Sequence, residues 1–365
     1  MNKKIHRILI DIGHPAHVHL FKNFAQQLFE NGYEILFTCR DKEFVIDLLK
    51  HYNFNYKSFG KNYKSLAGKS VGLIKFDIKQ LLTSLKFKPD LLLSHSSMYA
   101  AHAAFILRTP HISFEDTFNF EQIRLYEPFT KVILTSDYEH PLKSKKVIKY
   151  AGYHELAYLH PNYFTPDKSI VNELKINENE KYVIIRFVAW NATHDFGHKG
   201  ISYKNKLQAI KEFEKYARVF ISSESELPDE LKKYKMNIPP HKMHDALAFA
   251  SLLWAESFTM PSECSVLGVP SVINHNTKSF YLYEQEKKYG LCFNYTESNE
   301  DQLKAIEKGV EILQTPDIKQ QWQEKRKIML ADKIDVTAFM VWFIENYPES
   351  VKVMRENPDY QYNFK

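Results

Sequence analysis

A carboxylate, two hydroxyls and the start of a helix fall together between Ser257 and Glu263. Residues 254–272 are typical of a strand, a tight turn, a helix ending at Gly268 and a second strand, with Glu263 expected in the first helical turn. In an open α/β sheet such a helix begins at the carboxyl edge of a strand, where ligands bind. Its N-terminus suits phosphate, to which Ser257 and Thr259 offer hydroxyls, and Glu263 suits ribose hydroxyls. The segment predicts a nucleotide site; capping of the helix by the same side chains is the alternative.

Three histidines, His14, His17 and His19, follow the first strand expected in the sequence. An imidazole titrates near neutral pH, so His17 and His14 are candidates for a general base that deprotonates an acceptor hydroxyl. The short His17-x-His19 spacing also suggests a metal site. However, residues two apart on a helix point in different directions, and no acid or cysteine that could complete the ligand set lies nearby in the sequence. We therefore predict no metal. Histidines that only cap or pack are the other alternative.

Two acids, Glu115 and Asp116, come directly after the strand expected at residues 111–114. This places them at the same carboxyl edge as the histidine loop. We predict Glu115 as a catalytic residue that acts as the base or orients sugar and acceptor hydroxyls, and Asp116 as a substrate-binding residue. The alternative is that both acids cap the helix expected over residues 118–125.

A long loop runs from Arg186 to Gly200 after the first strand of the second half. It contains Arg186, His194, His198 and Lys199, which we predict to bind substrate. A guanidinium and an ammonium could offset the charge of a leaving nucleoside diphosphate without a divalent metal. Loops of this length in α/β domains are usually functional, while a surface loop with ion pairs is the alternative.

Alternating strands and helices are expected to position these residues. The first series covers residues 1–150, a segment rich in Tyr, His and Pro at 151–170 is typical of a linker, a second series covers 171–345, and a tail follows at 346–365. The pattern predicts two Rossmann-like α/β domains, each with a doubly wound parallel sheet, facing each other across a cleft. His241 and His244 are expected to be exposed at the start of a helix in the second domain.

The bulk composition narrows the class of protein. A net charge of +5 favours anionic ligands weakly, and no nucleic-acid recognition motif accompanies it. The sequence lacks an apolar stretch long enough to span a membrane, and its three cysteines lack metal spacing, so a cytoplasmic protein is expected. Residues 57–88 hold eight lysines, one acid and an apolar helical face. Such a segment can lie on the inner face of an anionic membrane, while a helix packed on the sheet with a solvated lysine edge is the alternative.

The sequence resembles domain-of-unknown-function family 354, a GT-B-like branch related to glycosyltransferases and UDP-N-acetylglucosamine 2-epimerases. Four segments carry the resemblance: residues 11–22 (DIGHPAHVHLFK), 114–117 (FEDT), 190–200 (WNATHDFGHKG) and 259–263 (TMPSE). It covers roughly residues 5 to 345. The resemblance implies a GT-B glycosyltransferase in cell-surface polysaccharide assembly that uses a nucleotide sugar, typically UDP-linked, and a glycan or lipid-linked acceptor. It also implies that Glu263 holds the ribose, that no metal or other cofactor is required and, as the alternative to an exposed helix start, that the stretch with His241 and His244 packs near the nucleotide base.

Two departures from the better-known relatives keep other functions open. The 2-epimerases have Gly-Asp-Thr where this chain has Ser94-His95-Ser96, and Ser-Gly-Gly where it has Ser257-Phe258-Thr259. Loss of the two glycines makes a close backbone approach to phosphate harder. An epimerase or hydrolase of the 2-epimerase type is the first alternative, and it would turn over a nucleotide sugar without an acceptor. A non-catalytic nucleotide-sugar binding protein is the second, and it would bind without forming product.

Overall fold

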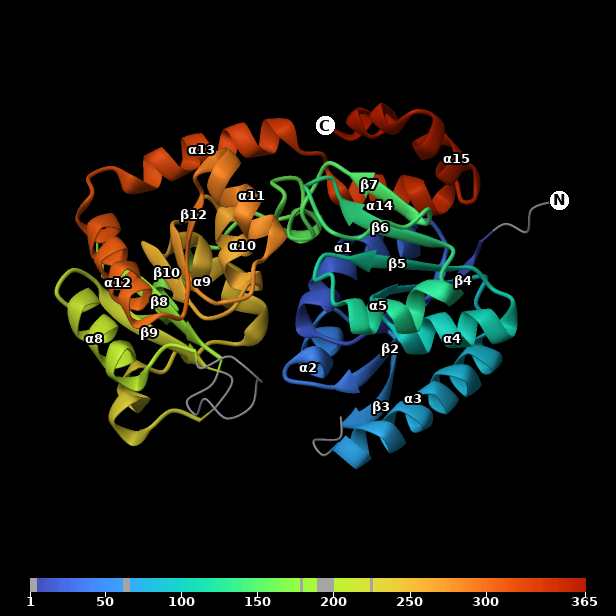
Figure 1. Ribbon diagram of the computed structural model, residues 1–365, viewed down its shortest axis with the longest axis horizontal. Helices are drawn as coiled ribbons and strands as arrows, with labels where there is room; N and C mark the ends of the chain where they lie inside the picture. Colours follow the sequence, from blue (N-terminus) through green and yellow to red (C-terminus); the bar gives the residue numbers. More distant parts are fainter. Residues whose placement is uncertain (1–4, 62–65, 178–179, 189–199, 224–225) are drawn as a thin grey trace. The chain divides into compact units, whose positions relative to one another are not determined.

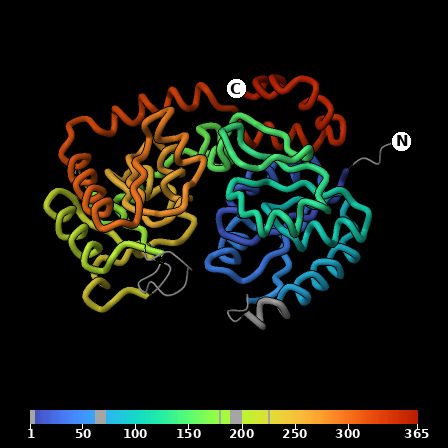
Figure 2. The backbone as a smooth tube through the Cα atoms, in the orientation of Figure 1, coloured from blue at the N-terminus to red at the C-terminus, as the bar shows by residue number. Residues whose placement is uncertain are grey.

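The chain forms two units, each with its own parallel sheet (Figures 1 and 2). The structure is a computed structural model that describes residues 5–61, 66–177, 180–188, 200–223 and 226–365. Unit 1 comprises Met1–Tyr163 together with Lys333–Lys365, and unit 2 comprises Phe164–Asp332. The expectation of two Rossmann-like α/β domains is confirmed.

Unit 1 contains a seven-stranded sheet in the order β3-β2-β1-β4-β5-β6-β7, in which every neighbouring pair is parallel. The strands are β1 (Arg7–Ile12), β2 (Glu34–Asp41), β3 (Tyr56–Lys61), β4 (Leu91–His95), β5 (His111–Glu115), β6 (Val132–Ser136) and β7 (Val147–Tyr150). The central strands are short, fully buried runs, as expected for strands covered on both faces. The strand order reverses between β1 and β4, and open α/β sheets bind ligands at such a switch point.

Two groups of helices accompany this sheet. In one group α4 packs against α3 and α5, and in the other α1 packs against α2, α6 and α14. The helices are α1 (Pro15–Glu30), α2 (Val45–His51), α3 (Leu66–Phe87), α4 (Met98–Leu107), α5 (Phe120–Tyr126), η1 (Glu127–Phe129), α6 (Leu156–Leu159), α14 (Val336–Glu345), α15 (Glu349–Glu356) and η4 (Pro358–Phe364).

The C-terminal segment belongs to unit 1, which differs from the expected domain boundary at residue 345. Helix α14 buries Phe339, Met340 and Phe343 and packs on α1 and α6. The hydroxyl of Thr337 donates to the carbonyl of Ala157 at 2.7 Å. Apolar periodicity predicts helix α14 but does not indicate which sheet the helix covers. The sequence therefore places it in the second domain, which precedes it along the chain.

Unit 2 contains a five-stranded parallel sheet in the order β12-β11-β10-β8-β9, with its own switch point between β8 and β10. Its strands are β8 (Tyr182–Phe187), β9 (Arg218–Ser223), β10 (Leu252–Ala255), β11 (Ser271–Asn274) and β12 (Cys292–Tyr295). Its helices are α7 (Ser169–Glu173), α8 (Tyr203–Phe213), η2 (Asp229–Tyr234), η3 (Pro240–Lys242), α9 (Met243–Phe249), α10 (Thr259–Leu267), α11 (Phe280–Tyr289), α12 (Asn299–Gln314) and α13 (Ile318–Asp332).

Helix α3 presents an apolar strip to solvent. Ile74, Ile78, Leu82 and Leu85 are between 49% and 62% exposed, so packing against the sheet does not account for this face of the helix. In the parts of the chain that the structure describes, no helix combines the length and the apolarity needed to cross a membrane.

A buried histidine ties β5 to its neighbours. The ring of His111 is fully buried and bonds to the hydroxyl of Ser94 at 2.9 Å and to that of Thr130 at 2.8 Å. Burial lowers the pKa of His111 from 6.5 to about 3. The ring is therefore neutral in the folded protein at pH values where it is protonated in the unfolded chain.

We expect His111 to make the stability of the protein depend on pH. Between pH 6 and pH 4 the unfolded chain binds a proton that the native ring does not, so the free energy of unfolding falls by up to about 1.4 kcal/mol per pH unit as the pH decreases. Urea denaturation at several pH values measures this slope. His111→Gln should flatten it, and the same change at the exposed His51 should not. An unchanged slope in His111→Gln would show that His111 does not carry the effect.

Candidate functional site

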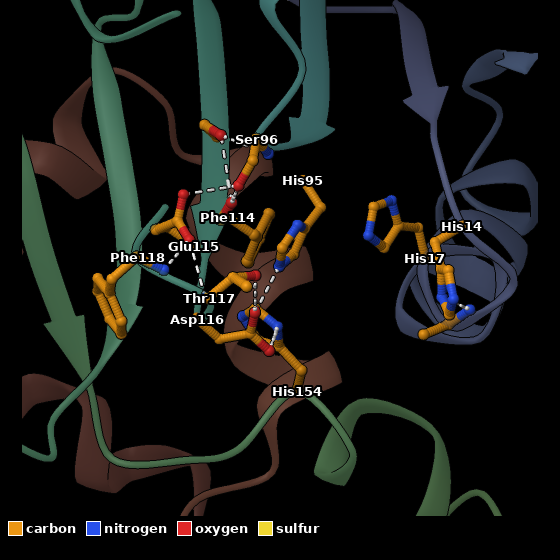
Figure 3. A network of polar contacts seen from close by, with 12 residues as sticks. His14, His17, His95, Ser96, Phe114, Glu115, Asp116, Thr117, Phe118 and His154 are labelled. Atoms are coloured by element: carbon orange, nitrogen blue, oxygen red, sulfur yellow. Dashed lines mark hydrogen bonds and ion pairs between the residues drawn. The ribbon is translucent and has the colours of Figure 1, made fainter. Parts of the chain in front are cut away.

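Four loops of unit 1 bring polar side chains together at the carboxyl edge of its sheet (Figure 3). His14 and His17 follow β1, His95 ends β4, Asp116 follows β5, and His154 lies between β7 and α6. Two of the predicted site residues, His17 and Asp116, each contact His95, which was not predicted. The switch point between β1 and β4 thus carries a cluster of imidazoles around one carboxylate.

Asp116 lies between two imidazoles. Its Oδ1 is 2.9 Å from Nε2 of His95, and its Oδ2 is 2.9 Å from Nδ1 of His154. Burial raises the pKa of Asp116, but the charges of His154 and His95 outweigh it and hold that pKa well below its usual value. Burial likewise lowers the pKa of His95, yet the net shift is upward because Asp116 lies beside it. Each of these two side chains therefore stabilises the charged form of the other.

His17 accepts a hydrogen bond at Nδ1, which fixes its tautomer. Its ring stacks on His95 with 4.4 Å between centroids, and its Nδ1 accepts a hydrogen bond of 3.2 Å from the amide of Gly13. Burial, followed by the charges of His95 and His14, lowers the pKa of His17 well below 6.5. A neutral ring whose Nδ1 accepts must carry its proton on Nε2. The predicted role of His17 as a general base does not fit this tautomer.

His14 caps helix α1, as the structural alternative proposed. Its Nδ1 accepts from the amide of Ala16 at 3.2 Å, and its Nε2 is 4.0 Å from a carboxylate oxygen of Glu43. The capping bond occupies the lone pair on Nδ1. His14 thus shares the limitation of His17 as a base.

Glu115 has all of its bonding capacity directed inward. One carboxylate oxygen accepts from the amides of Thr117 (2.9 Å) and Phe118 (2.7 Å). The other accepts from the hydroxyls of Ser96 (2.7 Å) and Tyr126 (2.6 Å). The side chain is buried, so the geometry favours a structural role over the predicted catalytic one.

The bonds of Glu115 hold two strained turns. Ser96 and Phe118 have φ angles of 52° and 54°, in the left-handed region that side chains other than glycine rarely adopt. Ser96 directly follows His95, and Phe118 lies two residues after Asp116. Glu115 is therefore a positioning residue, because its bonds fix the turns that present His95 and Asp116.

A second buried acid lies beneath the histidine loop. Asp11 is fully buried and bonds to Arg40 at 2.6 Å, to Thr38 at 2.8 Å and to Ser97 at 2.5 Å. A Cβ atom on Gly13 would lie 3.0 Å from the guanidinium of Arg40, so the loop needs a small residue there. This network fastens the ends of β1, β2 and β4 to one another.

In unit 2, Glu263 is paired with His244. Both side chains are buried, and Nε2 of His244 is 2.9 Å from Oε1 of Glu263. Helix α10 begins at Thr259, which places Glu263 in its second turn and not in the first as expected. The expectation that His244 is exposed is wrong, because helix α9 turns this ring inward toward α10.

The N-terminus of α10 has no side-chain cap. Phe258 occupies the N-cap position without a side-chain bond, and Thr259 is already inside the helix. The hydroxyl oxygen of Ser257 is buried and has no hydrogen-bond partner in the described ranges of the chain. The capping alternative for Ser257 and Thr259 is therefore absent, and the helix start is left with unpaired polar groups. Gly268 ends the helix with φ 72°, as the sequence indicated.

Glu256 holds both ends of the long loop after β8, and this role was not predicted. It accepts from the amides of Val188 (3.1 Å) and Ile201 (2.7 Å), and it pairs with Nζ of Lys206 at 3.0 Å. Arg186 precedes the loop and donates to the hydroxyl of Ser222 at 3.0 Å. The other predicted loop residues, His194, His198 and Lys199, lie outside the described residues.

Comparison with known proteins supports the same fold. The family described as "Protein of unknown function (DUF354)" matches residues 6–308. The uncharacterized protein MJ0665 of Methanocaldococcus jannaschii is 28% identical over 320 residues, 80% of this chain and 91% of that protein. The UDP-GlcNAc 2-epimerase from Neisseria meningitidis bound to UDP-GlcNAc is 15% identical, with a TM-score of 0.64 over 93% of this chain and 99% of that one. The glycosyltransferase VinC in complex with dTDP is 11% identical, with a TM-score of 0.59 over the same shares. These structures show the GT-B fold and no more.

We expect Glu115→Gln to destabilise the protein by about 1–3 kcal/mol, since an amide cannot accept four hydrogen bonds and turns its own donors toward other donors. Urea denaturation monitored by circular dichroism measures the change. Glu139→Gln is the matched control, because that side chain is exposed. Equal stability of the two variants would mean that Glu115 does not hold the turns.

Proposed function

We propose that this chain, which belongs to the family described as "Protein of unknown function (DUF354)", is a nucleotide-sugar-dependent glycosyltransferase of the GT-B type. Unit 2 binds the nucleotide of the donor and unit 1 binds the acceptor. The proposal extends to a UDP-linked donor and to a role in cell-surface polysaccharide assembly. The expectation that no metal or other cofactor is required stays a prediction, and the metal site inferred below departs from it.

The observation that carries this proposal is the uncapped start of helix α10. The first amides of a helix have no partner within it and attract anions, and here the N-cap residue, Phe258, gives them no side-chain bond. The buried hydroxyl of Ser257 lies beside them with its bonding capacity unused among the described residues. A diphosphate satisfies both at once.

The Glu263–His244 pair supports the ribose end of the site. Glu263 lies one turn into the same helix, and His244 holds its Oε1 at 2.9 Å. A carboxylate fixed in this way can accept hydrogen bonds from a vicinal diol, which is the chemistry of a ribose. Two neighbours with the fold were solved with UDP-GlcNAc and dTDP, which is compatible with a nucleotide in unit 2.

The carboxyl edge of unit 1 supplies groups for the acceptor. His17 offers an Nε2–H donor, and Asp116 is 20% exposed and can accept. These groups suit the hydroxyls of a glycan or of a lipid-linked sugar. The exposed apolar strip of α3, together with the neighbouring lysines Lys75 and Lys86, would support peripheral contact with an anionic membrane that holds such an acceptor.

We expect UDP and UDP-sugars to bind the purified protein, and Glu263→Gln to weaken that binding by about tenfold or more, because a charged hydrogen bond to the ribose is lost. Isothermal titration calorimetry with UDP, GDP, CDP and dTDP measures this. Glu307→Gln is the control, since that side chain is exposed in the same unit. Binding that is unaffected by Glu263→Gln would move the donor site elsewhere.

Turnover assays then separate the classes of enzyme. A glycosyltransferase consumes the donor only when an acceptor is added, whereas an enzyme of the 2-epimerase type converts the nucleotide sugar alone, which mass spectrometry and NMR distinguish. Conversion without an acceptor would replace the transferase proposal. Binding without any product would indicate a non-catalytic binding protein.

A further inference from the structure

We propose that His95, Asp116 and His154 form a binding site for one divalent transition-metal ion, of the Zn²⁺, Co²⁺ or Fe²⁺ class. One ligand atom from each side chain lies within 4.8 Å of the other two. His95 ends β4, Asp116 directly follows β5, and His154 lies in the segment between β7 and α6, which brings its ring to Asp116. This site is in unit 1 and does not depend on nucleotide binding in unit 2.

The donor set indicates the class of metal. Two imidazole nitrogens and one carboxylate oxygen suit borderline transition metals, whereas Mg²⁺ and Ca²⁺ prefer oxygen ligands alone. Three protein ligands leave one position open, which is the pattern of catalytic and not of structural zinc sites. The open side is that of Asp116, whose side chain is 20% exposed while the two imidazoles are 7% exposed.

The carboxylate of Asp116 already bridges the two imidazoles. Its Oδ1 is 2.9 Å from Nε2 of His95, and its other oxygen, Oδ2, is 2.9 Å from Nδ1 of His154. Neighbouring donors in a tetrahedral shell with bonds of about 2.0–2.2 Å lie about 3.3 Å apart, so an ion would take the place of the two bridging protons and draw one ligand atom of each side chain into the shell.

The surrounding residues hold the ligands in place. Glu115 fixes the turns beside His95 and Asp116 through its four bonds. His154 lies edge-on to Phe114 and is stacked on Tyr150, with 6.0 and 6.4 Å between ring centroids. Nδ1 of His154 faces Asp116 at 2.9 Å, so this is the nitrogen that the ring offers to an ion.

His17 stays outside the coordination shell. The amide of Gly13 occupies its Nδ1, so its Nε2 carries a proton and cannot ligate. It stacks on His95 and adds an N–H donor beside the open position. A bound ion would lower the pKa of a hydroxyl or water oxygen in the open position and so favour loss of its proton. His14, His17 and Glu115 cannot act as the base for this proton in their present bonding, because their acceptor atoms are already occupied. In this respect the inference adds to the proposed function, but its test needs no substrate.

The test uses the full-length protein freed of metal by a chelator. Titration with Co²⁺ should produce visible ligand-field absorption, and calorimetry with Zn²⁺ should show one ion per chain that displaces the Co²⁺ signal. Asp116→Asn and His154→Gln should each weaken Zn²⁺ binding by at least about tenfold. Loss of a residue that only hydrogen-bonds to a ligand already lowers metal affinity by about that factor, and loss of a ligand should cost more. Circular dichroism tests whether each variant folds. If one of them does not, His95→Gln is measured in its place.

The pair His102 and Asp77 provides the matched control. It is a histidine–aspartate contact of 3.1 Å in the same unit, but among the residues that the structure describes no second imidazole completes it. Asp77→Asn should leave Zn²⁺ affinity unchanged. Failure of the wild-type protein to bind Zn²⁺ or Co²⁺ at micromolar concentration, or equal affinities in Asp116→Asn and Asp77→Asn, would overturn the metal site. Neither outcome bears on UDP binding by unit 2.

Discussion

Four hydrogen bonds to the buried carboxylate of Glu115 hold the edge of unit 1 on which the histidine cluster depends. A left-handed backbone at a residue other than glycine costs about 1–3 kcal/mol, and Ser96 and Phe118 both adopt it. A hydrogen bond to a charged group contributes about 1.5–3 kcal/mol. The carboxylate can therefore offset the strain in both turns.

The three buried or half-buried acids of this edge differ in the groups that neutralise them. Asp11 faces Arg40, which keeps its proton at any physiological pH, so that pair is permanent. Glu115 faces hydroxyls and amides, which donate without carrying charge. Asp116 faces imidazoles, which can lose their protons to a competing cation. Asp11 and Glu115 are therefore structural residues, whereas Asp116 can exchange the protons between it and the imidazoles for a cation.

Much of the fold could be predicted from the sequence, because it follows from local pattern. Buried apolar runs separated by helices indicate parallel sheets, and the candidates His14, His17, Glu115 and Asp116 lie at the carboxyl edge where the pattern placed them. The sequence did not show which nitrogen and oxygen atoms of these side chains keep a lone pair available for a substrate or a proton. Whether Nδ1 of His17 or an oxygen of Glu115 is available depends on an amide or hydroxyl that only the folded chain supplies.

The missed residues were hidden for related reasons. His95 stood out in the sequence only as a departure from an acidic motif, although its place at the end of a strand beside the switch point was a usable signal. His154 fell in the expected linker, since the short strand β7 before it was not predicted. His244 was interpreted as exposed because it lies among polar residues at the start of a helix, whereas in the structure its ring is buried.

The return of the C-terminal segment to unit 1 makes unit 2 an insertion between two parts of another domain. Residues 164–332 are continuous, so unit 2 can complete its core as soon as they leave the ribosome. Unit 1 cannot, because helix α14 covers α1 and α6 and follows unit 2 along the chain. Until then the apolar surfaces of α1 and α6 are uncovered. The order of synthesis therefore delays the assembly of unit 1 until after that of unit 2. A premature stop shortly after residue 332 would leave a complete unit 2 attached to an incomplete unit 1.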